Sequence, residues 1–223
     1  MQNQNRTKIK KLTVTAMFAA VATVLMFLEI PLPLMPPFLK LDPSMLPILI
    51  GSFILGPESA VAMAFIKAIV HALMSQTGGV GELADFLMTS AFACTAAFIY
   101  RRNHTKSGAK IACVGGTAAL IVMAVFANRF LLIPFYSKFM ALDQIFAMCA
   151  AINPRITGMT GYLLYGVVPF NIIKGTLVSL LTFPVYKKLS NHIHKFMRQV
   201  DNSSAKGIDI GAKPAYNTLD PKN

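Results

Sequence analysis

Long apolar runs separated by short basic segments constrain this chain more than any other feature of its sequence. The runs recur from residue 12 to residue 186, and several reach about 20 residues, the length that a helix needs to cross the hydrocarbon core of a bilayer. Hydrophobic residues make up 55% of the chain and charged residues only 13%, which is far more apolar than a soluble domain. We therefore predict an all-α integral membrane protein with no separate catalytic domain.

Proline, glycine and charge mark the breaks between the apolar runs and predict six transmembrane helices. The helices are expected at about residues 12–32, 44–55, 60–74, 82–100, 111–134 and 169–186. A semi-polar connection, from residue 136 to 160, precedes the last helix. The membrane domain then covers residues 12–190, between a basic N-terminus (1–11) and a polar tail (191–223) that is predicted to be disordered.

The net charge of +12 lies in clusters beside the apolar runs and not on one continuous basic surface. Six spans place the three densest clusters, at residues 6–11, 101–110 and 187–198, on one side of the membrane. Basic residues are enriched in cytoplasmic loops, so both termini are predicted to be cytoplasmic. Lipid head groups and membrane topology explain this charge better than nucleic acid does.

Five prolines alternate with large apolar residues between Pro31 and Pro43. Proline lacks the N–H that a helix needs and restricts the residue before it, so this stretch is predicted to be an ordered, extended loop. A loop this apolar should fold back over the membrane bundle and cover a cavity on the outer face, with Lys40 and Asp42 at its end. The alternative is a simple rigid linker.

Asn171 and Lys174 stand i, i+3 in the last apolar run and share one helical face. A membrane helix keeps an amide and an ammonium only where protein, water or a ligand receives them. If Pro169 is the first helical position, both side chains fall in the first two turns and lie near the outer membrane face. They are a candidate binding site, unless Lys174 pairs with a carboxylate for structural reasons only.

A glycine-rich turn at residues 78–81 precedes Glu82 and Asp85, which share a face at the start of the fourth predicted helix. Six spans bring this turn, the proline loop, Asn128 and the start of the sixth helix to the same outer face. The alternative for Glu82 is simple capping of the positive end of the helix dipole.

These residues would give one pocket apolar walls, amides, an ammonium and carboxylates. A primary amide donates and accepts side by side, which matches the edge of an imide or pyrimidinedione ring, and an ammonium can donate to a neighbouring carbonyl. Carboxylates can accept hydrogen bonds from the hydroxyls of a sugar or polyol. A flat molecule, part apolar and part polyol, fits this set, but residue types alone do not separate a flavin from a pterin or thiamine.

Several stretches that are distant in the sequence form a specific combination. They are residues 36–44 (PPFLKLDPS), Gly56-Pro57, Lys67, residues 78–83 (GGVGEL), Asn128 and residues 169–175 (PFNIIKG). Together they resemble the substrate-binding S components of energy-coupling factor (ECF) vitamin transporters, and specifically those that bind riboflavin. The resemblance covers nearly the whole chain before the tail.

The resemblance implies six helices, capture of riboflavin from outside the cell, and assembly with a transmembrane ECF coupling protein and two cytoplasmic ATPases. It leaves open whether FMN is also bound. It further implies contacts to the isoalloxazine ring from Asn128, Asn171 and Lys174.

The same resemblance implies roles for two further groups of residues. The residues that would close around the ligand are Leu39, Lys40, Leu41, Asp42, Gly81, Glu82 and Asp85. The residues that would meet the coupling protein are Ala16, Ala19 and Ala20. Asp85 departs from the asparagine expected at its position.

Two alternatives stay open: an S component for another vitamin, such as folate or pantothenate, and a small integral membrane enzyme using His71, Glu82 and Asp85. The sequence contains no ordered set of nucleophile, base and metal ligands, so neither enzymatic activity nor a metal is expected, and riboflavin would be a transported ligand. It also lacks the GxxxxGK[ST] phosphate loop, so ATP-driven uptake needs a partner. The cysteines, which lack metal-type spacing, are interpreted as packing residues.

Overall fold

The computed structural model of the chain describes residues 2–205 apart from 33–34, 36–38, 76 and 104. It consists of helices and one two-stranded antiparallel ribbon. In chain order the elements are α1 (Gln2–Met26), β1 (Ile30–Pro31), β2 (Lys40–Leu41), α2 (Met45–Leu55), α3 (Pro57–Ala72), α4 (Val80–Arg102), α5 (Lys106–Ala127), the π-helical η1 (Asn128–Leu132), α6 (Ile133–Tyr136), α7 (Leu142–Ile152), α8 (Met159–Tyr162), the π-helical η2 (Leu163–Val167) and α9 (Val168–Ala205).

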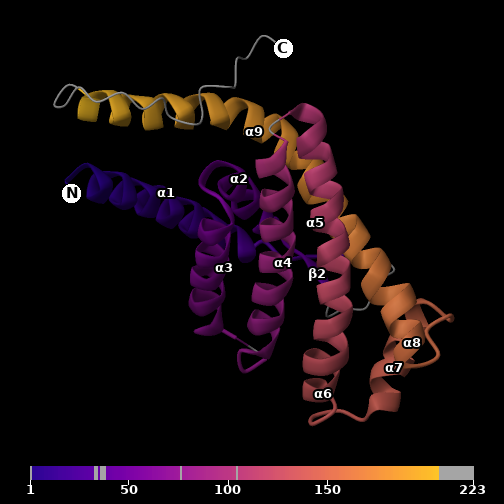
Figure 1. Cartoon of the computed structure of the whole chain (residues 1–223). Helices are drawn as coiled ribbons and strands as arrows, with labels where there is room; N and C mark the ends of the chain where they lie inside the picture. Colours follow the sequence, from indigo (N-terminus) through magenta and orange to yellow (C-terminus); the bar gives the residue numbers. More distant parts are fainter. Residues whose placement is uncertain (1, 33–34, 36–38, 76, 104, 206–223) are drawn as a thin grey trace.

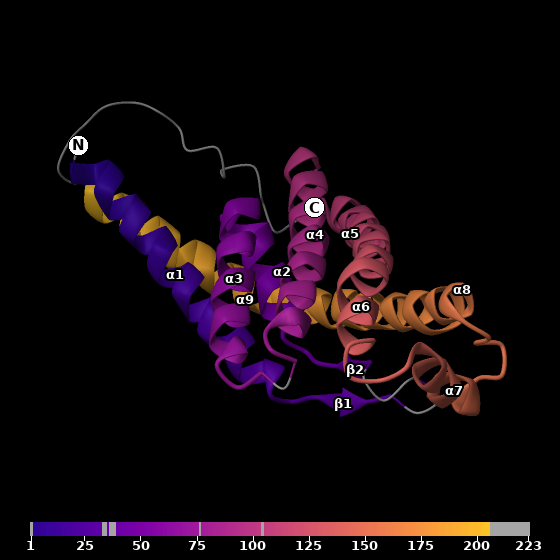
Figure 2. The ribbon, with the colours of Figure 1, turned by 90° about the horizontal axis from the view of Figure 1, so that it is seen from below.

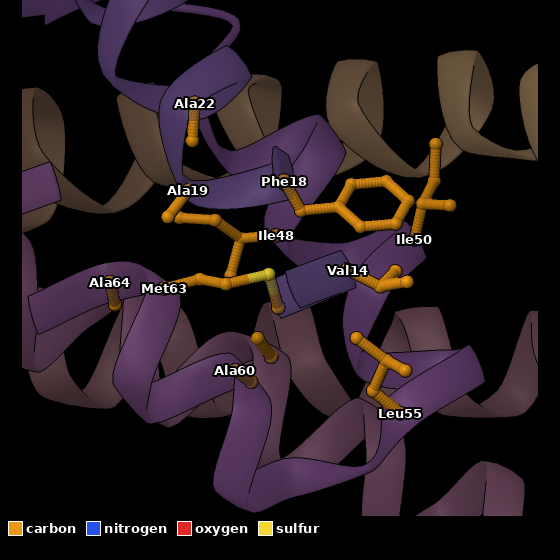
Figure 3. Close-up of a cluster of buried hydrophobic side chains, with 11 residues drawn as sticks. Val14, Phe18, Ala19, Ala22, Ile48, Ile50, Leu55, Ala60, Met63 and Ala64 are labelled. Carbon is orange, nitrogen blue, oxygen red and sulfur yellow. The ribbon is translucent and has the colours of Figure 1, made fainter. Parts of the chain in front are cut away.

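The first three helices share one apolar core. Phe18 and Ala19 of α1, Ile48 of α2 and Met63 of α3 are buried together, and Figure 3 shows them gathered between the three helices. Small residues such as Ala19 let membrane helices approach closely, so that packing can hold them together. This core fixes α3, which carries two of the polar side chains described below.

Glycines form the tight connections between α2 and α3 and between α3 and α4. Gly56 joins α2 to α3 with a φ of 96°, a value that suits glycine, and Pro57 occupies the first turn of α3. Gly78 and Gly79 have φ values of 57° and 89° in the turn before α4. The predicted end of the second helix and the predicted glycine turn are therefore both confirmed.

The first helix is shorter than predicted, because α1 ends at Met26 instead of near residue 32. Ile30 and Pro31 are extended and pair with Leu41 and Lys40 across the ribbon. Residues 33–34 and 36–38 of the predicted proline loop lie outside the described residues, so the predicted cover over the bundle stays a prediction.

Two long helices each contain a π-helical segment just before a proline. α5, η1 and α6 run without a break, and so do α8, η2 and α9. η1 ends two residues before Pro134, and η2 ends two residues before Pro169. A proline ring clashes with the carbonyl four residues earlier in an α-helix, so the wider π turn lets each helix continue through its proline.

The prediction that Pro169 begins the last helix is therefore wrong. That helix begins at Met159, which places Asn171 roughly 18 Å further along the axis at about 1.5 Å per residue. The connection before it is not simply semi-polar loop, since it contains α7. The tail that was predicted to be disordered from residue 191 is helical as far as Ala205, and residues 206–223 lie outside the described residues.

Four stretches of the described chain are helices long and apolar enough to cross a membrane. They are residues 8–26, 80–102, 107–136 and 159–186. With 11 and 16 residues, α2 and α3 are only about 16 and 24 Å long, which is less than the hydrocarbon thickness of about 30 Å. The count of six spans thus stays a prediction.

The helix ends that carry basic clusters lie toward the same end of the bundle. In Figure 1 the N-terminal part of α1, the α4–α5 connection and the C-terminal part of α9 all lie near the top. The α3–α4 turn and the α6–α7 connection lie at the bottom, which is the end seen in Figure 2, with the β1–β2 ribbon along one side. The glycine-rich turn therefore lies at the end opposite the basic clusters.

Candidate binding site

Four buried charged side chains from distant parts of the chain form one cluster. The Nζ atom of Lys174, on α9, lies 2.9 Å from Asp42 Oδ2 and 3.8 Å from Asp85 Oδ1. The Nζ atom of Lys67, on α3, lies 2.6 Å from Asp85 Oδ2. Two ammonium groups thus face two carboxylates, and this balance offsets the desolvation that buried ions suffer.

Ser44 connects the two halves of this cluster. Lys67 Nζ donates to Ser44 Oγ at 2.8 Å, and Ser44 Oγ donates in turn to Asp42 Oδ1. The same Asp42 oxygen accepts the backbone N–H of Ser44 at 3.0 Å, which orders the chain as it enters α2. Ser44 is the N-cap residue, but its hydroxyl serves the charged cluster and makes no capping hydrogen bond.

The charges around Asp42 decide its protonation state. Burial alone would raise the pKa of the Asp42 carboxyl, but the ammonium groups of Lys174 and Lys67 and the hydrogen bond from Ser44 outweigh burial. The pKa of Asp42 is therefore held well below its ordinary value. Asp42 is an anion at neutral pH and accepts hydrogen bonds without donating any.

Glu82 belongs to a second polar cluster, one helical turn from Asp85. Its Oε1 lies 3.0 Å from His71 Nδ1, and its Oε2 accepts from Ser75 Oγ at 2.7 Å and from Thr77 Oγ1 at 3.1 Å. Thr77 Oγ1 also accepts the backbone N–H of Gly81 at 3.1 Å. Glu82 thus holds the glycine turn against α3, a role beyond capping the helix dipole.

The two asparagines of the predicted site lie at the two π-helical segments. Asn128 is the first residue of η1; its Nδ2 donates to Ala124 O at 2.8 Å and its Oδ1 accepts from Tyr162 OH at 2.6 Å. Asn171 Nδ2 donates at 2.8 Å to the carbonyl of Val167, the last residue of η2. Both amides are buried, and π-helical turns occur frequently at functional sites.

Comparison with known proteins decides the family. The sequence profile described as "ECF transporter, substrate-specific component" matches residues 10–186. The chain belongs to this family.

Similar proteins support this assignment over most of the chain. The riboflavin transporter RibU of Staphylococcus aureus (strain TCH60) is 30% identical over 191 residues, which are 86% of this chain and 96% of that protein. The riboflavin transporter FmnP of Bacillus subtilis (strain 168) is 30% identical over 201 residues, covering 84% of this chain and 100% of that protein. A solved S component of a bacterial ECF transporter aligns with a TM-score of 0.67 at 30% identity, covering 83% of this chain and 98% of that structure.

Of the loop residues predicted to close around a ligand, the structure of this S component places Asp42 in the charged cluster. Leu39 is buried, and Leu41 is half-buried in the ribbon. Lys40 does not join the cluster: its side chain is 47% exposed and pairs with Glu29.

The three alanines predicted to meet a coupling protein do not share one environment. Ala16 and Ala20 are exposed on the outer face of α1. Ala19 is fully buried in the core with α2 and α3, where Figure 3 shows it close to Ile48. The structure therefore leaves Ala16 and Ala20, but not Ala19, accessible to another protein.

Sequence reasoning did not assign a site role to several residues that complete these clusters. They are Ser44, Lys67, Ser75 and Tyr162. A signal for Lys67 was present, because Lys67 and His71 are spaced i, i+4 on α3 while Asp85 and Glu82 are spaced i, i+3 on the helix that follows a short turn. Antiparallel neighbours with this spacing can make two polar contacts at once, here the Lys67–Asp85 ion pair and the 3.0 Å contact between His71 Nδ1 and Glu82 Oε1.

The described residues contain no group of three or more His, Cys, Asp or Glu side chains that could hold a metal ion. Cys113 and Cys149 are buried and Cys94 is half-buried, and the thiol of Cys94 lies 3.6 Å from the carbonyl of Pro57. Burial among apolar neighbours is how structural cysteines behave in folded proteins.

Proposed function

We propose that this S component binds riboflavin and delivers it for ATP-driven uptake, with riboflavin as transported ligand and without enzymatic turnover. One observation carries the proposal: two proteins named riboflavin transporters match at 30% identity over 96% and 100% of their own lengths. A match of that extent includes every segment that contributes to the charged cluster and the two asparagines.

The amide groups are suited to the pyrimidinedione edge of an isoalloxazine ring, which alternates carbonyl and N–H groups. A primary amide has two N–H donors, and Asn128 and Asn171 each use one for a carbonyl of their own helix. The second N–H of each amide is the donor that we assign to a ring carbonyl. Because both amides are buried, a ligand without acceptors at these positions would leave the second N–H group of each amide without a hydrogen bond.

Lys174 is the third ring contact in this proposal. Its distance of 2.9 Å to Asp42 is a hydrogen bond, whereas 3.8 Å to Asp85 is too long for one. An ammonium has three N–H donors, so Lys174 can direct one at a ring carbonyl or nitrogen and keep its bond to Asp42. The loop at residues 39–42 and the turn at Gly81, Glu82 and Asp85 then close around the polyol chain.

Membrane topology and partners complete the proposal. In this proposal the chain has six spans with both termini in the cytoplasm, so the basic ends of the bundle lie on the cytoplasmic side, where Lys and Arg are enriched in loops. The binding site then faces the outside of the cell. A transmembrane coupling protein and two cytoplasmic ATPases supply the energy. The exposed pair Ala16 and Ala20 is the surface that we assign to the coupling protein, since small residues four apart allow close helix contact.

Titration of the purified protein with riboflavin tests the proposal. Flavin fluorescence should be quenched saturably at one riboflavin per chain; FMN should be titrated separately in the same way, and folate and pantothenate should be added as competitors. Saturable quenching of FMN fluorescence would extend the ligand class to phosphorylated flavins. Absence of quenching, together with binding of folate or pantothenate, would overturn the assignment to riboflavin.

A further inference from the structure

Lys67 is the most deeply buried charged residue of the cluster, and no ligand contact is assigned to it. Its side chain is 0% exposed, whereas the side chains of Lys174, Asp42 and Asp85 keep 7%, 9% and 12% exposure. Its ammonium donates a hydrogen bond to Ser44 Oγ at 2.8 Å and forms an ion pair with Asp85 Oδ2 at 2.6 Å. Lys67 therefore lies behind the groups that can reach a ligand.

We propose that Lys67, on α3, is a positioning residue. It holds the carboxylate of Asp85, on α4, away from Lys174 and so keeps the Lys174 ammonium available to the ligand. The proposal rests on the riboflavin-binding function proposed above. It assigns Lys67 an effect on affinity that is transmitted through Asp85 and Ser44, without contact between Lys67 and riboflavin.

The distances show how the two lysines divide the carboxylates. Asp85 Oδ2 lies 2.6 Å from Lys67 Nζ, while Asp85 Oδ1 lies 3.8 Å from Lys174 Nζ. Asp85 is thus drawn toward α3, and Asp42 is the only described carboxylate to which Lys174 donates a hydrogen bond. Without Lys67, the nearest counter-charge of Asp85 is Lys174, and a closer approach between them would occupy the N–H that the ligand needs.

A second path runs through Ser44 and follows from hydrogen-bond direction. An ammonium can only donate, so Ser44 Oγ must accept from Lys67 and turn its own hydrogen toward Asp42 Oδ1. Asp42 Oδ2 is then left to accept from Lys174 at 2.9 Å. Lys67 thereby orients both carboxylates that flank Lys174.

A double-mutant cycle on the full chain tests the proposal, with riboflavin affinity measured by fluorescence quenching for wild type, K67M, D85N and K67M/D85N. We expect K67M to weaken binding by at least about tenfold, because it leaves a buried carboxylate to compete for Lys174. On the D85N background the same change should cost less than about threefold, because the competing carboxylate is gone. Lys138→Met, an exposed lysine outside both clusters, is the matched control and should bind as wild type does.

The spectrum of bound riboflavin separates a positioning role from a merely structural one. At saturation the flavin absorption bands of K67M should shift from those of wild type toward those of K174M, because both variants lose the same hydrogen bond to the ring. Unfolding of part of the protein would lower the bound fraction without moving the bands.

Several results would overturn the proposal. K67M could bind within about twofold of wild type, or it could cost the same factor on both backgrounds, which would make Lys67 independent of Asp85. If K67M yields too little folded protein, the riboflavin affinity of the charge-balanced K67M/D85N protein is compared with that of D85N. An affinity about tenfold weaker than that of D85N would contradict the proposal. Failure of wild type to quench riboflavin would instead count against the proposed function itself.

Discussion

Replacing Lys174 with methionine should strongly destabilise the unliganded protein. The variant keeps a side chain of similar length but leaves Asp42 and Asp85 with Lys67 as their only close ammonium group among the described residues. Lys174 and Asp42 are 7% and 9% exposed, so water cannot replace the lost partner effectively. The two carboxylates also repel each other once the positive charge between them is removed.

The size of the effect follows from the burial of the pair. Removing one partner of a buried ion pair costs about 3–5 kcal/mol, and the small remaining exposure favours the lower end, about 3 kcal/mol. A chain of this size loses about 2–4 °C in Tm per kcal/mol, so K174M should melt about 6–12 °C below wild type. Thermal unfolding in one detergent, followed by intrinsic tyrosine fluorescence or by size-exclusion chromatography of heated samples, measures this difference.

Two comparison variants make the test specific. Lys40→Met removes a lysine of the same type from the partly exposed pair with Glu29, where the expected cost is below about 1 kcal/mol. The double variant K174M/D42N removes one charge of each sign and should recover at least about half of the lost Tm. Equal Tm values for K174M and Lys40→Met would refute the reasoning, because burial would then have no effect on the cost of breaking an ion pair.

Three further predictions concern binding, coupling and pH. Asn171→Ala should weaken riboflavin binding by at least about 1 kcal/mol, because ring polar atoms lose a partner in a buried site, while the exposed Asn103→Ala should change nothing in the same quenching titration. Tryptophan at both Ala16 and Ala20 should abolish riboflavin uptake by cells and leave binding intact; normal uptake would contradict the assignment of that face to the coupling protein. The folded-state pKa of Asp42 lies below its unfolded value, so its ionised form contributes stability that is complete above about pH 4 and is lost as the pH falls through the folded pKa. The Tm difference between wild type and Asp42→Asn should accordingly be constant from about pH 8 to about pH 5 and should become smaller below about pH 4. A Tm difference that grows on acidification would contradict the lowered pKa of Asp42.

The sequence predicted the meeting of distant charged residues because a membrane interior tolerates few unpaired ions. Lys174 needed a carboxylate or a ligand, and the acidic candidates at the predicted outer face included Asp42 and Asp85. The structure brings these three side chains together. The pairing of Lys174 with a carboxylate, which was the alternative to a binding site, is therefore present. Because Asp85 lies 3.8 Å away, Lys174 can pair with Asp42 and still donate a hydrogen bond to a ligand.

The pairing partner of Asp85 could not be predicted from local spacing alone. Lys67 and His71 share a face of α3, but which acidic residue meets each one depends on the register of α3 against α4. The connection between α3 and α4 sets that register, and Gly78 and Gly79 in it adopt positive φ values that suit a tight turn. Lys67 consequently meets Asp85, and His71 meets Glu82.

The same limit of local reasoning explains the error at Pro169 and shows what the prolines contribute. A proline is a normal first residue of a helix, and the short, mostly apolar stretch at residues 159–168 did not by itself distinguish that case from a helix that continues through a π turn. Continuation changes the site, because Asn128 begins one π turn and Asn171 bonds to the last residue of the other. A π turn adds one residue to its helix and rotates every later side chain about the axis relative to a regular α-helix. The π turn before Pro169 therefore helps to determine where the amide of Asn171 points, whereas Asn128 stands at the start of its π turn and is not rotated by it.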